Sequence, residues 1–166
     1  MLDQKIEQAV NKQINREMAA AYNYLAMTAH FEKLNLKGFA HWTRTQRQEE
    51  LNHADRLFTY LLDRGGTICL EAIPEPKTGY QTVEEVFQAA LEQEQQNTRE
   101  INALYQIAGQ ENDIATQSML KWFIDEQVEE EKIVDESLAL VRLAGENMSA
   151  LLVLNGQFGQ RTAESE

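Results

Sequence analysis

A glutamate and a histidine three residues apart, Glu50 and His53, are the two side chains of this sequence best suited to bind one metal ion together. Residues three apart share a face of an α-helix, so their carboxylate and imidazole can reach the same ion. A single Glu-x-x-His pair is weak support, because most such pairs lie on helix surfaces. The pair becomes informative only if other carboxylates meet it at the same depth in the fold.

Four expected helices each carry polar residues near the middle of an otherwise apolar stripe. Apolar residues three and four positions apart mark the face of a helix that packs in a core. The interruptions are Glu17 in residues 3–33, Glu50 and His53 in 37–64, Glu94 in 83–108, and Gln127 and Glu130 in 114–143. Helices packed side by side bring their midpoints to one level, so these side chains are predicted to converge inside the fold.

The charge of this cluster predicts a metal. Carboxylates removed from water cost several kcal/mol per ion unless a positive charge neutralises them, and no Lys or Arg stands on the interrupted turns of the stripes. Oxygen ligands with one imidazole suit iron or manganese, and zinc can compete. Two metals bridged by shared carboxylates would use all of the ligands.

Other polar residues lie close to these positions. Glu49, Glu126 and Glu129 stand beside the stripes; acidic runs usually form a solvated helix face, but these three flank the ligands and predict a weaker third metal position. On the first helix the stripe is expected to continue from Glu17 to Leu25. Tyr24 is two turns from Glu17, and its simplest role is a core tyrosine hydrogen-bonded to a nearby carboxylate.

Helix breakers are confined to a few places in the chain. The two prolines, Pro74 and Pro76, fall in one stretch, and the eight glycines read as helix stops and loops. Thr82 is predicted to cap a helix, and so are Asp113 and Asn147. The result is an all-α prediction of five helices, over about 3–33, 37–64, 83–108, 114–143 and 147–154.

Connection lengths predict the topology. The first and second helices, and the third and fourth, are joined by only a few residues, so each pair forms an antiparallel hairpin. Residues 65–81 can reach roughly 56 Å when extended, whereas a 28-residue helix is roughly 42 Å long. The second and third helices can therefore run parallel. We expect one domain over residues 1–166: a four-helix bundle with one long crossover and a short fifth helix.

Composition narrows the functional classes. The chain has 166 residues and a net charge of -12, which disfavours binding to nucleic acid and to anionic membranes. Its longest aliphatic run, residues 150–154, is too short to cross a bilayer, and its charged first residues do not resemble a signal peptide. The single cysteine, Cys69, agrees with a reducing compartment, so a cytoplasmic location is expected.

The chain resembles the haem-free bacterial ferritins over essentially its whole length. The resemblance rests on Arg16-Glu17 with Tyr24, on the stretch 48–53, on Glu94 and on the stretch 126–130. It implies a ferritin-like fold and a ferroxidase that oxidises Fe(II) with O2 or H2O2 at a di-iron centre. It also implies storage of ferric mineral in a hollow homo-oligomeric shell of twenty-four subunits.

The resemblance also implies a role for each matching residue. Glu17, Glu50 and His53 would bind the first iron, Glu94 and Glu130 the second, with Glu50 bridging and Gln127 orienting a water or substrate oxygen. Glu49, Glu126 and Glu129 would form the extra iron site, and Tyr24 would donate an electron to the centre. Haem is not expected, because bacterioferritins have a methionine haem ligand where this chain has Leu51.

Two alternatives remain at this level. One is a di-iron carboxylate oxidase that acts on an organic substrate and stores no mineral, and the other is an acidic helical scaffold without metal. A storage shell needs surfaces for assembly, and the apolar fifth helix, with Met148, Leu151, Leu152 and Leu154, favours it over an isolated oxidase.

Overall fold

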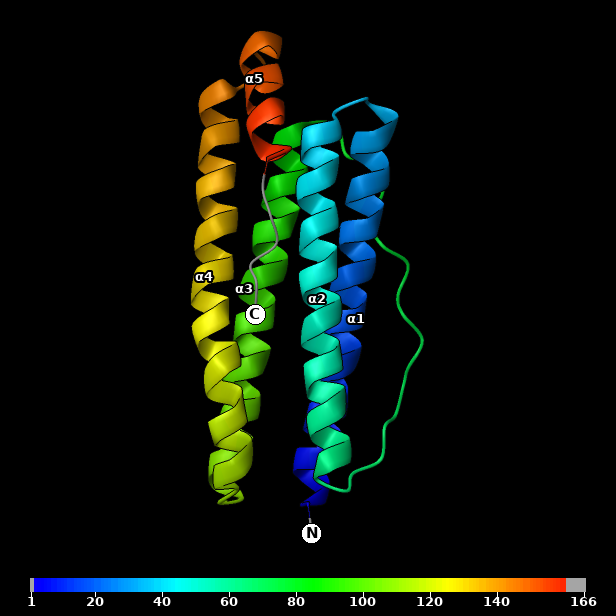
Figure 1. Cartoon of the computed structure of the whole chain (residues 1–166), viewed down its shortest axis with the longest axis vertical. Coiled ribbons are helices and arrows are strands. Elements are labelled where there is room, and N and C mark those ends of the chain that lie inside the picture. Colours follow the sequence, from blue (N-terminus) through cyan, green and yellow to red (C-terminus); the bar gives the residue numbers. More distant parts are fainter. Residues whose placement is uncertain (1, 161–166) are drawn as a thin grey trace.

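The computed structural model describes residues 2–160, and all of its regular elements are helices. Four long helices form a bundle, and a short fifth helix crosses one end of it (Figure 1). The elements are α1 (Gln4–Lys33), α2 (Lys37–Asp63), α3 (Val83–Gln110), α4 (Ile114–Ala144) and α5 (Met148–Phe158). The prediction of an all-α bundle with a short C-terminal helix is confirmed.

The connections follow the predicted topology. Short turns join α1 to α2 and α3 to α4, and each pair is antiparallel (Figure 1). The crossover from α2 to α3 runs outside the bundle from one end to the other, so α2 and α3 point the same way. It is held to α1 by Asn11, whose side chain binds the Thr67 carbonyl at 2.8 Å and the Cys69 amide at 2.7 Å.

Three of the helices begin where their capping residues predict. The hydroxyl of Thr82 accepts from the backbone N–H of Glu85 at 3.1 Å. Asp113 accepts from Thr116 at 2.9 Å, and Asn147 accepts from Ala150 at 3.1 Å. Each bond satisfies a first-turn N–H that has no partner within its own helix.

On α1 the expected core position of Leu25 is wrong. Leu25 is 42% exposed, whereas Tyr24 is fully buried. Each residue turns the helix by about 100°, so Tyr24 lies about 20° from the direction of Glu17 and Leu25 about 80° from it. Two successive steps of four residues, from Glu17 to Leu25, leave the face of the helix that points to the core. A step of four followed by one of three, from Glu17 to Tyr24, stays on that face.

Helix α5 extends past its predicted end at Leu154, and Gly156, expected to punctuate a loop, lies inside it. Phe158 explains the extension: it is buried against Phe39 and Phe87, with ring centroids 5.2 and 5.4 Å apart. Burying a phenylalanine contributes about 1.5–3 kcal/mol, more than the roughly 1 kcal/mol that a helical glycine costs.

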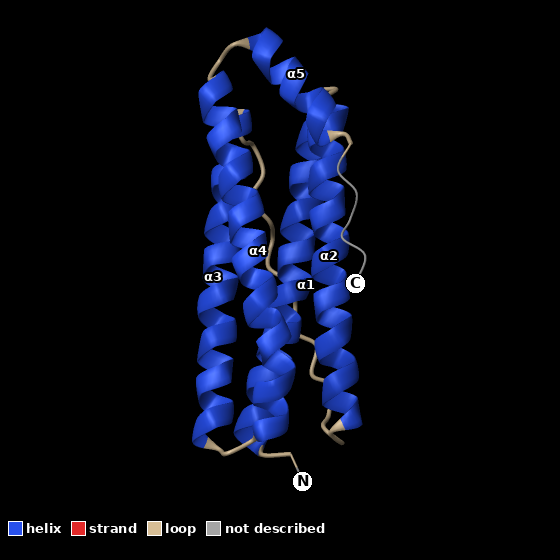
Figure 2. Ribbon diagram, turned by 60° about the vertical axis from the view of Figure 1, so that its left-hand side comes forward, coloured by secondary structure: helices blue, strands red, loops and turns tan. Residues whose placement is uncertain are grey.

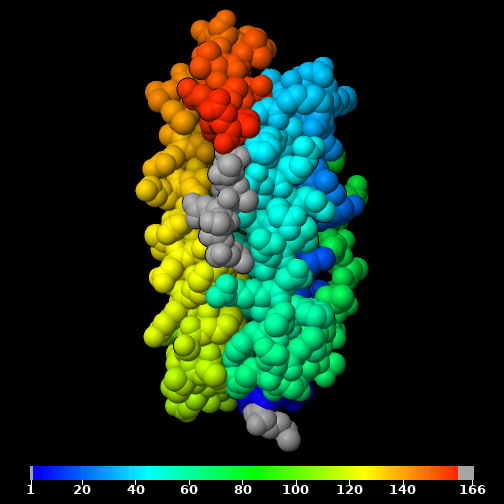
Figure 3. Space-filling model, viewed as in Figure 1, coloured from blue at the N-terminus to red at the C-terminus, as the bar shows by residue number. Residues whose placement is uncertain are grey.

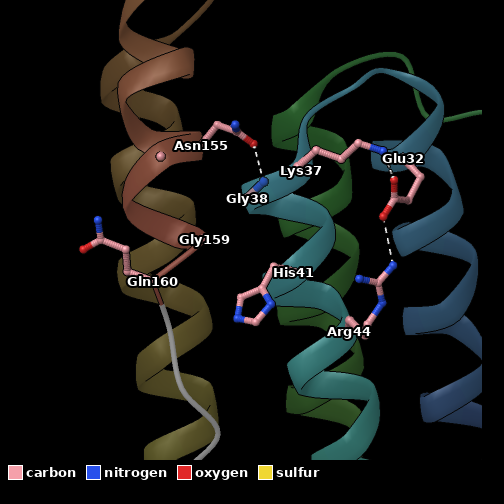
Figure 4. Close-up of a pocket in the computed structure, with 9 residues that line it drawn as sticks. Glu32, Lys37, Gly38, His41, Arg44, Asn155, Gly159 and Gln160 are labelled. Atoms are coloured by element: carbon pink, nitrogen blue, oxygen red, sulfur yellow. Dashed lines mark hydrogen bonds and ion pairs between the residues drawn. The ribbon is translucent and has the colours of Figure 1, made fainter.

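The same helix is joined closely to the start of α2. The side chain of Asn155 accepts a hydrogen bond from the N–H group of Gly38 at 2.9 Å (Figure 4). It also accepts one from the N–H group of Phe39 at 3.1 Å. Leu36, the N-cap residue of α2, has a side chain that makes no capping hydrogen bond. A Cβ at Gly38 would lie 1.5 Å from the Asn155 carbonyl oxygen, so this approach requires glycine. Figure 2 shows α5 spanning that end of the bundle between α4 and α2.

The interior is divided into two apolar clusters. The cluster near α5 is largely aromatic and includes Phe31, Phe39 and Trp42. The cluster at the opposite end is mostly aliphatic and includes Ile14 and Leu57. The surfaces of α2 and α4 make up much of the face shown in Figure 3. Within residues 2–160, no helix has both the length and the apolar character needed to span a membrane.

Candidate metal centre

A layer of polar side chains separates the two apolar clusters at mid-bundle. We call it the carboxylate layer. Its members come from all four long helices and are at most 4% exposed: Glu17, Glu50, His53, Glu94, Gln127 and Glu130. They are the residues that interrupt the apolar stripes, and the fold buries all of them.

One group within the layer is close enough to hold a single ion. Ligand atoms of Glu17, Glu50 and His53 all lie within 4.8 Å of one another. Glu50 Oε2 and His53 Nδ1 are 3.5 Å apart, and both atoms are buried without a hydrogen bond. Leaving such atoms unpaired is costly in a protein interior. A cation between them would satisfy both.

A second group shares the histidine. Ligand atoms of His53, Glu126 and Glu130 also lie within 4.8 Å of one another. Glu126, assigned from the sequence to the weaker position, therefore lies beside Glu130. Glu94 belongs to neither group; it accepts a hydrogen bond from the hydroxyl of buried Tyr24 at 2.6 Å. This is the tyrosine–carboxylate contact expected from the sequence.

The electrostatics of the layer favour a bound cation. Burial raises the pKa of Glu50 well above its ordinary value, and the charges of Glu94 and Glu17 add to this. Burial also raises the pKa of Glu94, although the Tyr24 hydroxyl opposes the shift. Within residues 2–160, Glu17, Glu50 and Glu94 form no ion pair with a lysine or arginine. The donor set and its uncompensated charge therefore fit a hard or borderline metal ion.

Aromatic side chains fix the orientation of the histidine. The ring of His53 packs edge-on against Trp122 at 5.5 Å and Phe123 at 5.9 Å between centroids. The guanidinium of Arg56 lies 4.0 Å from the centre of the Trp122 ring. These contacts leave the imidazole little freedom to turn away from Glu50.

Amide side chains hold two of the carboxylates, a role that the sequence did not indicate for them. Gln13 donates to Glu17 at 2.7 Å, and Gln46 donates to Glu130 at 2.9 Å. Asn97 donates to Glu17 at 3.1 Å. Gln13 stands four residues before Glu17, so helical spacing could have identified it. The other two bonds cross between helices and depend on how those helices are rotated.

The three accessory glutamates differ in exposure. Glu49 is buried, Glu126 is half-buried and Glu129 is exposed. Glu126 is the one that joins a group of potential ligands. Any ion held by these residues would lie nearer to solvent than one held by Glu17, Glu50 and His53.

Comparison with known proteins identifies the family. The ferritin-like domain family matches residues 7–144 of the chain. The chain belongs to the ferritin family. The bacterial non-heme ferritin of Staphylococcus aureus (strain USA300) is 37% identical to this ferritin over 166 residues, which is 100% of each chain. The bacterial non-heme ferritin of Bacteroides fragilis (strain 638R) is 37% identical over 161 residues, covering 97% of this chain and 100% of its own.

A solved structure has the same fold. The open pore ferritin of the hyperthermophilic archaeon Archaeoglobus fulgidus superimposes on this ferritin with a TM-score of 0.96. The two sequences are 39% identical, and the match covers 98% of this chain and 100% of the other.

Proposed function

We propose that this protein stores and detoxifies iron, oxidising Fe(II) to Fe(III) at a di-iron centre within each subunit. Its family and its non-heme ferritin relatives support iron storage. The observation that carries the proposal for this chain is that Glu50 Oε2 and His53 Nδ1 face each other beside Glu17, both buried and without a hydrogen bond among the described residues. Iron is the substrate and the stored product in this reaction.

The residues of the layer have distinct roles in the proposal. Glu17, Glu50 and His53 bind the first Fe(II), while Glu94 and Glu130 bind the second and Glu50 bridges the two. Gln127 orients a water or substrate oxygen. Two Fe(II) lose two electrons, which reduce one O2, and the reduced oxygen takes up two protons to give H2O2. When H2O2 is the oxidant, two electrons and two protons convert it to two water molecules. Carboxylate ligands suit the reaction because they stabilise the more highly charged Fe(III).

The remaining proposed residues act around this centre. Glu49, Glu126 and Glu129 bind a third, more exchangeable iron, because they lie nearer to solvent. When a third Fe(II) is oxidised as well, Tyr24 supplies the fourth electron, so that four electrons and four protons reduce one O2 to two water molecules. Its hydrogen bond to Glu94 supports this role. Haem plays no part in this proposal.

Assembly is the second half of the proposal. We propose a closed cytoplasmic shell of twenty-four copies that encloses the ferric mineral. Large apolar side chains remain exposed on α1 and α5, including Tyr22, Met148 and Val153, and neighbouring copies would cover them. Three pockets, of about 450, 430 and 330 Å³, lie against α5, and none of the three is lined by the carboxylate layer. This placement gives no support to an oxidase with an organic substrate at the layer.

Aerobic addition of Fe(II) to the purified protein tests both halves. We expect a fast oxidation phase of about two Fe(II) per subunit, followed by slower growth of a mineral inside a particle of shell mass. Glu50→Ala should lose the fast phase, while Asp55→Ala, at an exposed position on the same helix, should keep it. Oxidation no faster than in buffer would overturn the ferroxidase, and particles no larger than dimers by light scattering would overturn the shell.

A further inference from the structure

Asn97 is a fully buried amide whose partners are all side chains at or beside the carboxylate layer. It stands on α3, one turn after Glu94, on a stripe otherwise continued by Ile101 and Leu104. Its Oδ1 accepts from Gln13 Nε2 at 2.6 Å. Its Nδ2 donates to Glu17 Oε2 at 3.1 Å and lies 3.4 Å from Gln127 Oε1.

These bonds give Glu17 a fixed orientation before any ion binds. Its Oε1 accepts from Gln13 and its Oε2 from Asn97, so both oxygens are held by neutral amides. Each carboxylate oxygen has two lone pairs, so an amide bond and a metal bond can exist on the same atom. In contrast, Glu50 Oε2 has no hydrogen-bond partner within residues 2–160.

A second buried asparagine shows what a purely structural amide looks like in this fold. Asn11, on α1, is 7% exposed, and its side chain binds backbone groups of Glu7, Thr67 and Cys69. It holds the crossover against the bundle. Asn97 makes no such backbone bond among the residues described; its hydrogen bonds end on Glu17 and on the two glutamines beside it.

We infer that Asn97 is a positioning residue for metal binding: it holds Glu17 in the orientation that completes the first site and links it, through the same amide, to Gln127. This inference rests on the proposed function. Outer hydrogen bonds that orient a ligand typically change metal affinity 10- to 100-fold when they are removed. Asn97→Leu keeps a side chain of similar size but removes every one of these bonds.

The test uses Co(II) alone, without oxygen, as a spectroscopic probe of the first site. Asn97→Leu should weaken Co(II) binding at that site about 10- to 100-fold and alter the visible absorption that reports the ligand geometry. Asn11→Leu is the matched control, because it makes the same substitution at a buried asparagine outside the layer. It should lower thermal stability by a similar amount and leave the affinity and the spectrum unchanged.

The outcomes separate this inference from the proposed function. If the parent protein binds no Co(II) at the layer, the metal centre itself is wrong. If the parent binds and Asn97→Leu binds within twofold with the same spectrum, only the positioning role is wrong. Should Asn97→Leu fail to fold, Asn97→Ala adds no bulk and must show the same loss. Gln13→Leu should also weaken binding, because it removes the amide bond to the other Glu17 oxygen.

Discussion

Two polar clusters of this bundle both contain carboxylates but differ in their charge balance. The carboxylate layer at mid-bundle contains four glutamates, one histidine and one glutamine. At the end of the bundle opposite α5, Arg64 makes a two-pronged ion pair with Asp113 at 2.7 and 3.0 Å, and Tyr60 hydrogen-bonds Thr116 at 2.8 Å. We call Tyr60, Arg64, Asp113 and Thr116 the end cluster. It contains its own cation, whereas within residues 2–160 Glu17, Glu50 and Glu94 pair with no lysine or arginine.

The pKa values of carboxyl groups in the two clusters are shifted in opposite directions. Hydrogen bonds from Arg64 hold the pKa of Asp113 at about 2, below its ordinary 3.8. Burial and neighbouring carboxylates push the pKa of Glu50 upward. The half-buried carboxylate of Asp113 has its charge balanced by Arg64, whereas several buried carboxylates without a fixed cation destabilise the fold until an ion binds. The difference distinguishes a structural acidic cluster from a metal site.

The largest expected effect comes from neutralising Glu50. Glu50→Gln should bind the first metal more than about 100-fold more weakly, since losing a ligand exceeds the 10- to 100-fold cost of losing its outer support. In EDTA-treated protein the same change should raise the free energy of unfolding at pH 7 by on the order of 1 kcal/mol. Metal titration and thermal unfolding, at equal subunit concentration, measure the two effects.

The pH dependence of this gain gives a second check. The pKa of Glu50 is higher in the folded than in the unfolded chain, so its folded form binds the proton more tightly. The destabilising effect of the Glu50 carboxylate on the fold therefore grows as pH rises above about 4.5 and vanishes below about pH 4.5. A stability gain that persists unchanged at pH 4 would contradict the assignment of the cost to the Glu50 charge.

A smaller effect should follow from removing accessory carboxylates. The double variant Glu49→Ala with Glu126→Ala should still bind two metals per subunit, because it leaves in place the ligands proposed for both: Glu17, Glu50, His53, Glu94 and Glu130. It should change the number of Fe(II) oxidised per O2 and slow repeated turnover by about 10-fold, the low end of outer-residue effects. Anaerobic titration beside stopped-flow oxidation separates binding from turnover. Loss of one of the two metals would show that Glu126, which lies beside Glu130, is a primary ligand.

The carboxylate layer could be predicted from the sequence because residues three and four apart lie on the same face of a helix, whatever that helix packs against. Glu17 and Glu50 interrupt apolar stripes, and that signal needs no tertiary information. The hydrogen bond from Asn97 to Glu17 joins two helices, and it depends on their relative rotation, which periodicity does not define. Leu25 was placed wrongly because each step of four residues turns the helix by about 40° more than one full turn. Two such steps from Glu17 therefore leave the core face.

The end of α5 was missed for a different reason. Gly156 disfavours a helix locally, but Phe158 packs into the aromatic cluster and outweighs it. The partners of Phe158 are Phe39 and Phe87, more than 70 residues earlier in the chain. Rules that use only neighbouring residues cannot predict a contact between such distant positions.

The smallest expected effect belongs to the end cluster, and its sign is opposite to that of Glu50. Asp113→Asn keeps a good N-cap for α4 but removes the charge that binds Arg64. We expect a loss of about 1 kcal/mol in the free energy of unfolding at pH 7, because the pair is near the surface and partly screened. The folded pKa of Asp113, about 2, is below the unfolded value of 3.8. Its stabilisation is therefore complete above about pH 4 and is lost as pH falls toward 2. Denaturant unfolding of parent and variant between pH 7 and pH 2 should show the two curves of unfolding free energy against pH converging at the acid end.

The control is Asp55→Asn, at an exposed aspartate on α2, which should differ from the parent by less than about 0.5 kcal/mol in the free energy of unfolding at any pH. Equal stability of Asp113→Asn and the parent at pH 7 would mean that the arginine pair contributes nothing, and that charge pairing does not distinguish the two clusters.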